Sequence, residues 1–443
     1  MLTVTVKPHK EFFTPHTPNQ RLFLQLSAAP EWGTAQHRPD LSIVFVIDTS
    51  GSMRDRVSSR SGPKLNKLEL VMQSVEGVLD AAGLQDGDRL ALVSFDDETR
   101  VNVPFVPASR RARLRAAVHS LNQFSGGTLM GAGMLEAYEL LKHETGSQRV
   151  ILLTDGETMD SDLVEEMGRK LHDLQVPVTA IGVGAFNVPI LTGVADQTQG
   201  RVMDVVAGEV DPQSPSVAVG QLPEAILGEV QQAQREVVTD MALTCRTVKG
   251  VTVNRITRVA PQQNEVDVAG RPYLLGNAAH GEETTFIVEC TLPERSSNRM
   301  RLAQLGLTYQ VPGADYRGEA APVDVVVEYT TDQARLAELD HGVLQWVQQR
   351  NVEGIIKRAA AEANSDPAAA AKTLRLAQNL TRKLGNSNMT KVLDKALDEL
   401  QTNKTISLGT AKTMRMGSKT QTLRATESEA LPSSEEIRKL TGA

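Results

Sequence analysis

Three short stretches carry side-chain oxygens directly after apolar or glycine-rich segments. Asp48, Ser50 and Ser52 lie in the run "DTSGS" that follows the apolar segment "LSIVFVI". Thr128 lies in "FSGGTLMGAG", and Asp155 ends the apolar run "LLTD". These residues offer carboxylates and hydroxyls but no cysteine or histidine, and hard divalent cations prefer such ligands. We therefore predict a site for Mg²⁺, with Mn²⁺ and Ca²⁺ as open alternatives.

The segments around these residues alternate between strand-like and helix-like patterns from about residue 40 to residue 206. Several of them are apolar and rich in β-branched residues, as buried strands are: "LSIVFVI", "RLALVSF", "RVILLTD" and "PVTAIGVG". Segments with helical spacing lie between them, and "GRVMDVV" is expected to be the edge strand. This alternation predicts a doubly wound, mostly parallel α/β sheet with helices on both faces. Ligands of such sheets bind at the carboxyl ends of the strands, where the three loops can converge.

Taken together and in this order, the motifs resemble the metal-ion-dependent adhesion site of von Willebrand factor A (VWA) domains. The family pattern is D-x-S-x-S, then a threonine, then an aspartate, and Asp48, Ser50, Ser52, Thr128 and Asp155 match it at every position. The resemblance covers residues 40–207. It implies that the serines and the threonine ligate the ion directly, that the aspartates act directly or through water, and that an acidic residue of a partner protein completes the shell.

The resemblance implies a non-enzymatic, Mg²⁺-dependent protein-binding module that acts as a scaffold or adaptor. One alternative is an accessory subunit of an AAA+ ATPase or of a kinase and phosphatase signalling system. A metal-dependent hydrolase is a weaker alternative, because the sequence offers no clear general base beyond the ligands. The run "GGTLMGAG" lacks the Lys and Ser/Thr of a phosphate-binding loop, and Ser50 has no G-x-S-x-G context of a nucleophile.

Two further features near the metal motif, a polar loop and a pair of acidic residues, could have a structural or a functional role. The run "MRDRVSSRSGPK" after the first motif is expected to be a solvated loop, whose arginines could instead contact an acidic partner. Glu157 and Asp160 follow the last motif, and we expect them to cap the next helix.

The flanking segments predict other units. Residues 1–38 and 240–330 show short alternating segments separated by turn residues, which predict an antiparallel β-sandwich into which the α/β domain is inserted. A helix is expected between them at residues 223–239. Residues 331–401 have helical periodicity and predict a small bundle. These flanks are similar to those of bacterial cytosolic proteins with VWA domains.

The last residues, 402–443, lack apolar periodicity and are rich in threonine and serine, so we expect a disordered tail. Basic residues surround its threonines, which suits a Ser/Thr kinase substrate read by a phosphothreonine-binding (FHA-like) protein. The candidate phosphoacceptors are Thr410, Thr413, Thr420 and Thr422.

Composition narrows the function classes. The 443 residues carry a formal net charge of −7 and 4% aromatic residues, which disfavours nucleic-acid binding. No apolar run reaches the ~20 residues of a membrane span, and no secretory signal pattern begins the sequence. Cys245 and Cys290 show no metal-binding spacing, so we expect reduced thiols and a cytoplasmic location, with a single disulfide between them left open.

Overall fold

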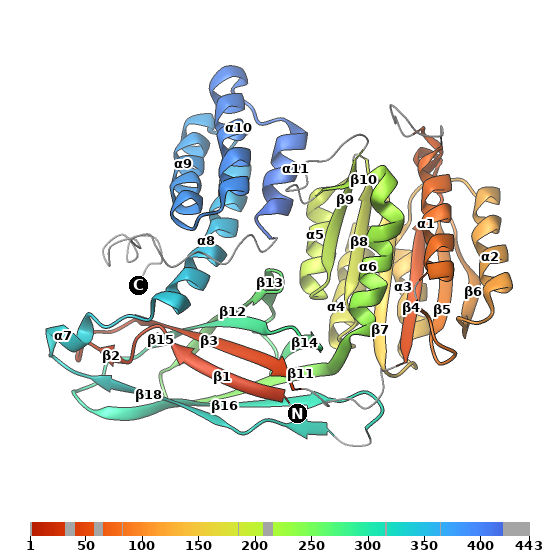
Figure 1. The fold of residues 1–443 in the computed structure, drawn as a ribbon. Helices are drawn as coiled ribbons and strands as arrows, with labels where there is room; N and C mark the ends of the chain where they lie inside the picture. Colours follow the sequence, from red (N-terminus) through yellow and green to blue (C-terminus); the bar gives the residue numbers. More distant parts are fainter. Residues whose placement is uncertain are drawn as a thin grey trace.

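The structure, a computed structural model, places an α/β domain and a helical domain side by side on a β-sandwich (Figure 1). It describes residues 2–31, 40–56, 65–81, 83–184, 186–206, 216–314, 317–363 and 365–419. Among them, no helix is long and apolar enough to cross a membrane.

The α/β domain is built on one sheet with the strand order β10-β9-β8-β7-β4-β5-β6. All neighbours in it are parallel except β5 and β6, which pair antiparallel. Its strands are β4 (Leu41–Asp48), β5 (Arg89–Phe95), β6 (Thr99–Pro107), β7 (Ser147–Thr154), β8 (Val178–Val183), β9 (Arg201–Val206) and β10 (Ser216–Ala218). The predicted doubly wound fold is confirmed.

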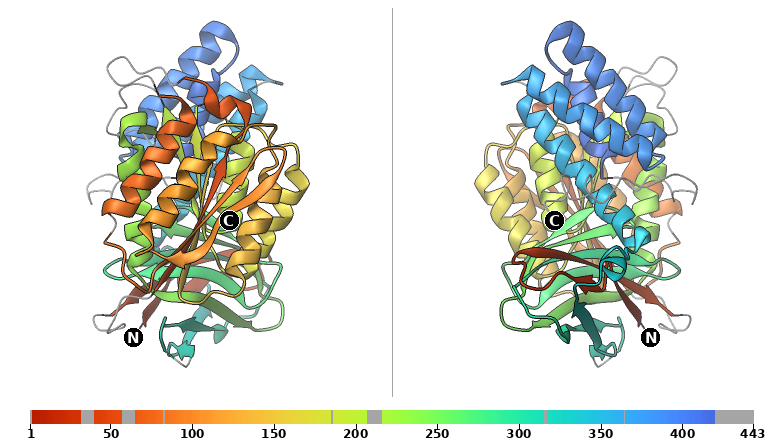
Figure 2. Two further views of the ribbon diagram at one scale, coloured as in Figure 1. Left: turned by 90° about the vertical axis from the view of Figure 1, so that its right-hand side faces the viewer. Right: turned by 90° about the vertical axis from the view of Figure 1, so that its left-hand side faces the viewer.

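Helices cover both faces of this sheet (Figure 2). Alternate residues of β4 explain why: Ile43 and Phe45 belong to the core under one helical layer, while Val44 and Val46 belong to the core under the other. The first layer contains α1 (Lys67–Ala81), α2 (Arg111–Ser120) and α6 (Leu222–Gln234). The second contains α3 (Met130–Leu141), α4 (Ser161–Asp173) and α5 (Val188–Gln197). Short 3₁₀ turns lie at η1 (Gly51–Arg54), η2 (Leu121–Gln123) and η3 (Val219–Gln221).

Two boundaries differ from the sequence predictions. The segment "GRVMDVV" is not at the edge, because β10 pairs with β9 beyond it. The helix predicted over residues 223–239 ends at Gln234, and β11 begins at Glu236. The residues Val237, Val238 and Thr239 are β-branched, so they favour the strand over a last helical turn.

The sandwich consists of two sheets whose chain segments come from both sides of the α/β domain. One sheet has the order β1-β3-β15-β12-β13 and the other β14-β11-β16-β18-β2, with β17 paired to β16. The bounds are β1 (Leu2–Pro8), β2 (Phe12–Phe13), β3 (Gln20–Pro30), β11 (Glu236–Thr247), β12 (Thr252–Ala260), β13 (Asn264–Val266), β14 (Tyr273–Ala279), β15 (Thr284–Leu292), β16 (Arg299–Gln310), β17 (Arg317–Glu319) and β18 (Val323–Tyr329). Cys245 and Cys290 are buried free thiols in this core. Burial raises the pKa of Cys245 to about 11.

His9 gives the sandwich a pH-dependent stability. Its side chain is buried against Phe13 and Phe23, and its Nδ1 accepts a hydrogen bond from the Phe23 N–H at 3.1 Å. Burial, with Lys10 nearby, lowers the pKa of His9 to about 3. The unfolded chain binds a proton near pH 6.5 that the folded chain does not bind, so stability falls as the pH drops below 6.5.

We expect this single group to remove about 2 kcal/mol of unfolding free energy between pH 7.5 and pH 5. Urea unfolding at several pH values measures the effect, with His9→Asn as the comparison because its amide oxygen can accept the same hydrogen bond. The variant is expected to lose less stability than the wild type on acidification. Equal pH dependence in both proteins would contradict the assignment.

The helical region begins with α7 (Gln333–Leu336) and α8 (His341–Glu362) and continues with α9 (Pro367–Lys383), α10 (Ser387–Asn403) and α11 (Leu408–Gly417). Helix α8 joins two cores, since Val343 and Val347 pack on the sandwich while Val352 and Ile356 pack in the helical bundle. The long helix therefore ties the bundle to the sandwich.

The first part of the predicted disordered tail is ordered. Residues 408–417 form α11, whose Met414 is fully buried in the bundle core. Its Lys412 donates to the Gly184 carbonyl at 2.8 Å and pairs with Asp204 at 2.5 Å, both in the α/β domain. Lys419 pairs with Asp196 of α5. Figure 1 shows α11 between the other bundle helices and the α/β domain, so this segment docks the bundle onto that domain.

Candidate metal centre

The three predicted loops lie at the carboxyl end of the α/β sheet. Asp48 is the last residue of β4, and Asp155 directly follows β7, which pairs with β4. The Gly51 N–H donates to the Gly126 carbonyl at 3.1 Å, which joins the first loop to the loop of Thr128. The fold therefore brings the three sequence motifs to one place.

Asp48 is a fully buried carboxylate held by its neighbours. One of its oxygens accepts from the Ser50 N–H at 2.8 Å and the other from the Thr154 hydroxyl at 2.6 Å. Burial raises the pKa of Asp48, against the hydrogen bonds from Ser50 and Thr154 that favour its charged form. Thr154 was not singled out in the sequence, and its position one residue before Asp155 is the signal that could have found it.

The hydroxyls of Ser50 and Ser52 connect the first loop to Asp155. The two serine oxygens lie 3.2 Å apart, and Ser52 donates to Oδ1 of Asp155 at 2.8 Å. The other oxygen of Asp155 accepts from the ammonium group of Lys67, the first residue of α1. Lys67 is a site residue that the sequence reasoning missed, because nothing in the local pattern relates it to a loop nearly ninety residues later.

Thr128 is half-buried and fixed through its backbone, with its carbonyl accepting from the Met159 N–H at 3.0 Å. The glycines before it are needed for space and not for a turn with positive φ. A Cβ on Gly126 would lie 2.6 Å from a carboxylate oxygen of Asp97, and one on Gly127 would lie 2.3 Å from the other. Gly51 has no such neighbour within 3.9 Å. Close approach of Asp97 therefore requires glycine at positions 126 and 127.

Asp160 caps a helix, but not the one predicted. Its carboxylate makes no capping bond to α4, and instead accepts from the N–H groups of Gly131 and Ala132 at 3.0 and 2.9 Å. These groups belong to the first turn of α3, whose free donors favour an anion. Asp160 thus holds the start of the helix that follows Thr128.

The remaining polar groups near the first loop point elsewhere. The Thr49 hydroxyl donates to the Phe95 carbonyl and to Asp96, each at 3.1 Å. Arg54 donates to the carbonyls of Asn122 and Phe124, so this arginine of the predicted solvated loop braces a neighbouring loop. Residues 57–64 of that loop lie outside the described residues.

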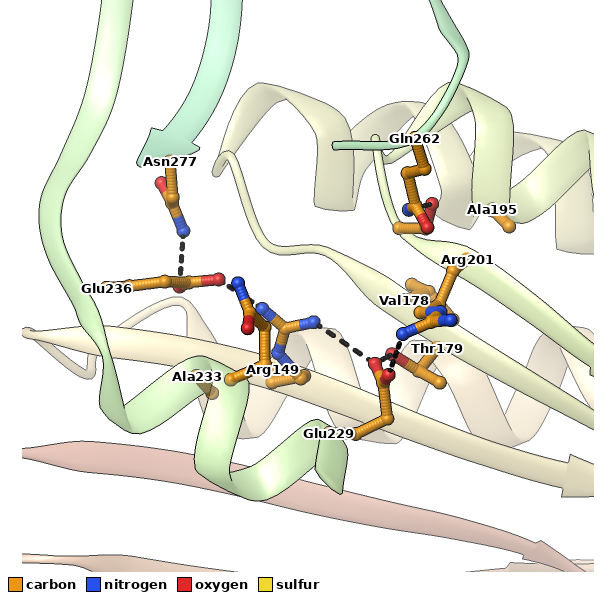
Figure 3. Close-up of polar contacts among 12 residues, drawn as sticks. Arg149, Val178, Thr179, Ala195, Arg201, Glu229, Ala233, Glu236, Gln262 and Asn277 are labelled. Atoms are coloured by element: carbon orange, nitrogen blue, oxygen red, sulfur yellow. Dashed lines mark hydrogen bonds and ion pairs between the residues drawn. The ribbon is translucent and has the colours of Figure 1, made fainter. Parts of the chain in front are cut away.

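A second polar cluster lies at the opposite, amino end of the sheet, where the α/β domain meets the sandwich (Figure 3). Arg149 of β7 pairs with Glu236 of β11 and lies 3.7 Å from Glu229 of α6. Glu229 also pairs with Arg201 at 2.6 Å, and Asn277 donates to Glu236 at 2.9 Å. These residues line a cavity of about 370 Å³. The buried network fixes the α/β domain on the sandwich and leaves the carboxyl end of the sheet facing away from it.

The residues at the carboxyl end fit a hard divalent cation. The donors are carboxylate and hydroxyl oxygens, and among the described residues no Lys, Arg or His pairs with the buried carboxylate of Asp48. No group of three or more His, Cys, Asp or Glu side chains suited to a metal occurs in the described part of the chain. The oxygens of Asp48, Ser50, Ser52, Thr128 and Asp155 are hard ligands, and this hydroxyl-rich set suits Mg²⁺ or a similar ion.

Comparisons with known proteins agree with this architecture. Residues 42–209 match the model of the von Willebrand factor type A domain, and residues 341–424 match that of the Sll0103-like, C-terminal alpha-helical domain. The uncharacterized protein YfbK of Escherichia coli (strain K12) is 29% identical over 191 residues, which are 41% of this chain. The chain spans only 31% of that relative's length.

Two solved structures are similar over nearly the whole chain. The von Willebrand factor type A protein from Catenulispora acidiphila has a TM-score of 0.76 at 18% identity, covering 96% of this chain and 97% of that one. The ArnB paralog VWA2 from Sulfolobus acidocaldarius has a TM-score of 0.60 at 15% identity, covering 95% and 100%. At these identities the likeness concerns the fold alone. The chain therefore carries a von Willebrand factor type A domain over residues 42–209, together with antiparallel sheets and a C-terminal helical domain of the Sll0103-like type.

Proposed function

We propose that the VWA domain binds Mg²⁺ through Asp48, Ser50, Ser52, Thr128 and Asp155, and that an acidic side chain of a protein partner completes the shell. The observation that carries the proposal is the convergence of four of these residues: the chain of hydrogen bonds from Ser50 through Ser52 to Asp155 lies beside the buried carboxylate of Asp48. When bound, the ion would supply a positive charge that attracts a carboxylate.

The chain's own residues would keep this site open to a partner. The hydroxyls of Ser50 and Ser52 are neutral, so they add no negative charge that would repel a partner's carboxylate. Thr154 fixes the first loop by donating to Asp48. Asp160 fixes the start of α3, which follows Thr128, by accepting from the Gly131 N–H. The sandwich contacts the amino end of the sheet, opposite the site. We infer a non-enzymatic adaptor that works in the cytoplasm.

Titration calorimetry with MgCl₂ and MnCl₂ tests the ion site. Ser50→Ala and Thr128→Ala are expected to weaken binding by about tenfold or more, since each removes one oxygen ligand. Ser109→Ala, at an exposed serine of the same domain, is the matched control and should bind as the wild type does. Equal affinity in all four proteins would contradict the assignment.

Cross-linking and capture from the native cell test the partner. A true partner is expected to be lost in EDTA and with Ser50→Ala, and to be retained by Ser109→Ala. Substituting candidate acidic residues of that partner with glutamine or asparagine should abolish the same contact. Capture that is indifferent to EDTA and to Ser50→Ala would reject a metal-bridged contact.

The C-terminal threonines differ in their suitability for a kinase and an FHA-like reader. Thr410 is 3% exposed and donates to Glu399 at 2.7 Å, so a kinase could not reach it while α11 is docked. Thr413 is half-buried, and Thr420 and Thr422 lie outside the described residues. Thr410 is therefore not an accessible phosphoacceptor in this arrangement, and we propose Thr413, Thr420 and Thr422 in its place.

A further inference from the structure

The ion pair between Lys67 and Asp155 places a fixed positive charge inside the candidate metal centre. The side chain of Asp155 is 0% exposed and that of Lys67 is 17% exposed, so water screens the pair little. The carboxylate has no free oxygen in this arrangement, because Ser52 donates to one oxygen and Lys67 to the other. A cation that binds Asp155 must therefore share this carboxylate with the ammonium group.

Hydrogen bonds around Lys67 fix its backbone beside the first motif loop. Asn66 and Glu69 form a reciprocal capping box, in which each side chain accepts from the other's N–H, at 2.7 and 2.8 Å. The Lys67 N–H donates to the Asp55 carbonyl at 3.2 Å, which ties the helix start to the first motif loop. The end of the lysine side chain also lies near Gly184, where a Cβ would be 3.5 Å from Cε and 3.8 Å from Nζ.

A lysine is an unfavourable choice for this position by local rules. The first turn of a helix carries the positive end of the helix dipole and favours acidic residues. Lys67 is the first residue of α1, so its charge meets that positive end. Helix formation therefore does not explain a lysine at this position, whereas the ion pair with Asp155 does.

We propose that Lys67 sets the affinity of the site by competing with the divalent cation for Asp155, an inference that rests on the function proposed above. Two carboxylates and one ammonium leave the unfilled site with one net negative charge, and the affinity of a cation site depends on the number of charged ligands. The chain alone would therefore hold the ion weakly. An added carboxylate from a partner restores the missing negative charge, so ion and partner bind together more tightly than either alone.

Titration of the full chain with MnCl₂ and MgCl₂ tests the proposal through three substitutions. Lys67→Gln removes the charge, Lys67→Met removes it while keeping the aliphatic stem beside Gly184, and Lys67→Arg keeps the charge as the matched control. The neutral variants are expected to bind both ions about tenfold more tightly, and the affinity of Lys67→Arg is expected to stay near that of the wild type.

Thermal unfolding is the second readout. In EDTA the neutral variants should melt below the wild type, because Asp155 loses its counter-charge, and added Mg²⁺ should raise their Tm by more than it raises that of the wild type.

The outcomes separate this inference from the function on which it rests. Equal or weaker ion binding by both neutral variants, with the wild type still binding, would overturn the role of Lys67 alone. Absence of binding in the wild type and in every folded variant would overturn both the ion site and the role of Lys67. Tighter binding by Lys67→Arg as well would show that the charge is not the cause, and would also overturn the proposal.

Discussion

Arg149→Met is expected to lower the free energy of unfolding by about 3–5 kcal/mol, the usual cost of removing one partner from a buried ion pair. The Arg149 side chain is 6% exposed and pairs with Glu236, which is 8% exposed. Without the guanidinium, Glu236 keeps only neutral donors, Ser147 at 3.0 Å and Asn277 at 2.9 Å. Urea unfolding followed by circular dichroism measures the loss.

The second substitution Glu236→Gln makes this prediction specific. The double variant leaves Glu229 paired with Arg201 and removes the carboxylate that Arg149→Met would leave unpaired, so it should regain part of the lost stability. The recovery is partial because Glu236 also lies near the buried guanidinium of Arg258, which loses that charge. Arg169→Met is the control, because Arg169 and its partner Glu165 are largely exposed, and it should change stability by less than about 0.5 kcal/mol. A double variant no more stable than Arg149→Met would mean that packing, and not the charge, causes the loss.

Thr410→Glu is expected to release α11 from the rest of the protein. The new carboxylate would lie beside Glu399, which already accepts from Thr410 and from Ser407, at a position that is 3% exposed. Burying the new carboxylate at this position costs about 1–3 kcal/mol, because no cation or added donor among the described residues meets it there. Glu399 is only half-buried, and its negative charge adds a repulsion that water partly screens. Limited trypsin digestion should then cleave after Lys412 and Arg415, and amide exchange of residues 408–419 should become faster.

Two variants control for this effect. Thr405→Glu adds the same charge at an exposed position just before α11 and should leave trypsin resistance unchanged. Thr410→Val removes the hydroxyl without adding charge and should loosen the helix less. Resistance of Thr410→Glu equal to that of the wild type would contradict the buried contact with Glu399.

The sequence predicted those parts of the fold and of the site that depend on neighbouring residues in the chain. The apolar strands and the oxygen-bearing residues after them are visible in the residue pattern, and the parallel sheet then requires that Asp48 and Asp155 meet. Lys67 and Thr154 were not predicted, because their roles come from contacts between separate segments. Asp160 was assigned to the nearest helix, although the fold places the N–H groups of α3 closer.

The order of helix α11 was not predicted, for a different reason. Its sequence is rich in threonine and basic residues, which is typical of disorder. It contains few apolar residues that become buried, among them Met414 and Met416. Its order depends on surfaces supplied by the bundle and the α/β domain, with Lys412 and Lys419 meeting Asp204 and Asp196. Composition alone cannot reveal such surfaces.

The insertion of the VWA domain into the sandwich sets an order of events during synthesis. Strand β3 needs β15 as its neighbour, and the hydroxyls of Ser27 and Thr285, which meet across this pair, are 258 residues apart in the chain. At about 5–20 residues per second, the ribosome needs roughly 10–50 s to supply the missing strand. The VWA domain lies entirely within that interval, so it can fold while the β1–β3 hairpin still exposes Leu22, Leu24 and Leu26. Nascent chains should therefore depend on chaperones at the N-terminal hairpin and not at the metal centre.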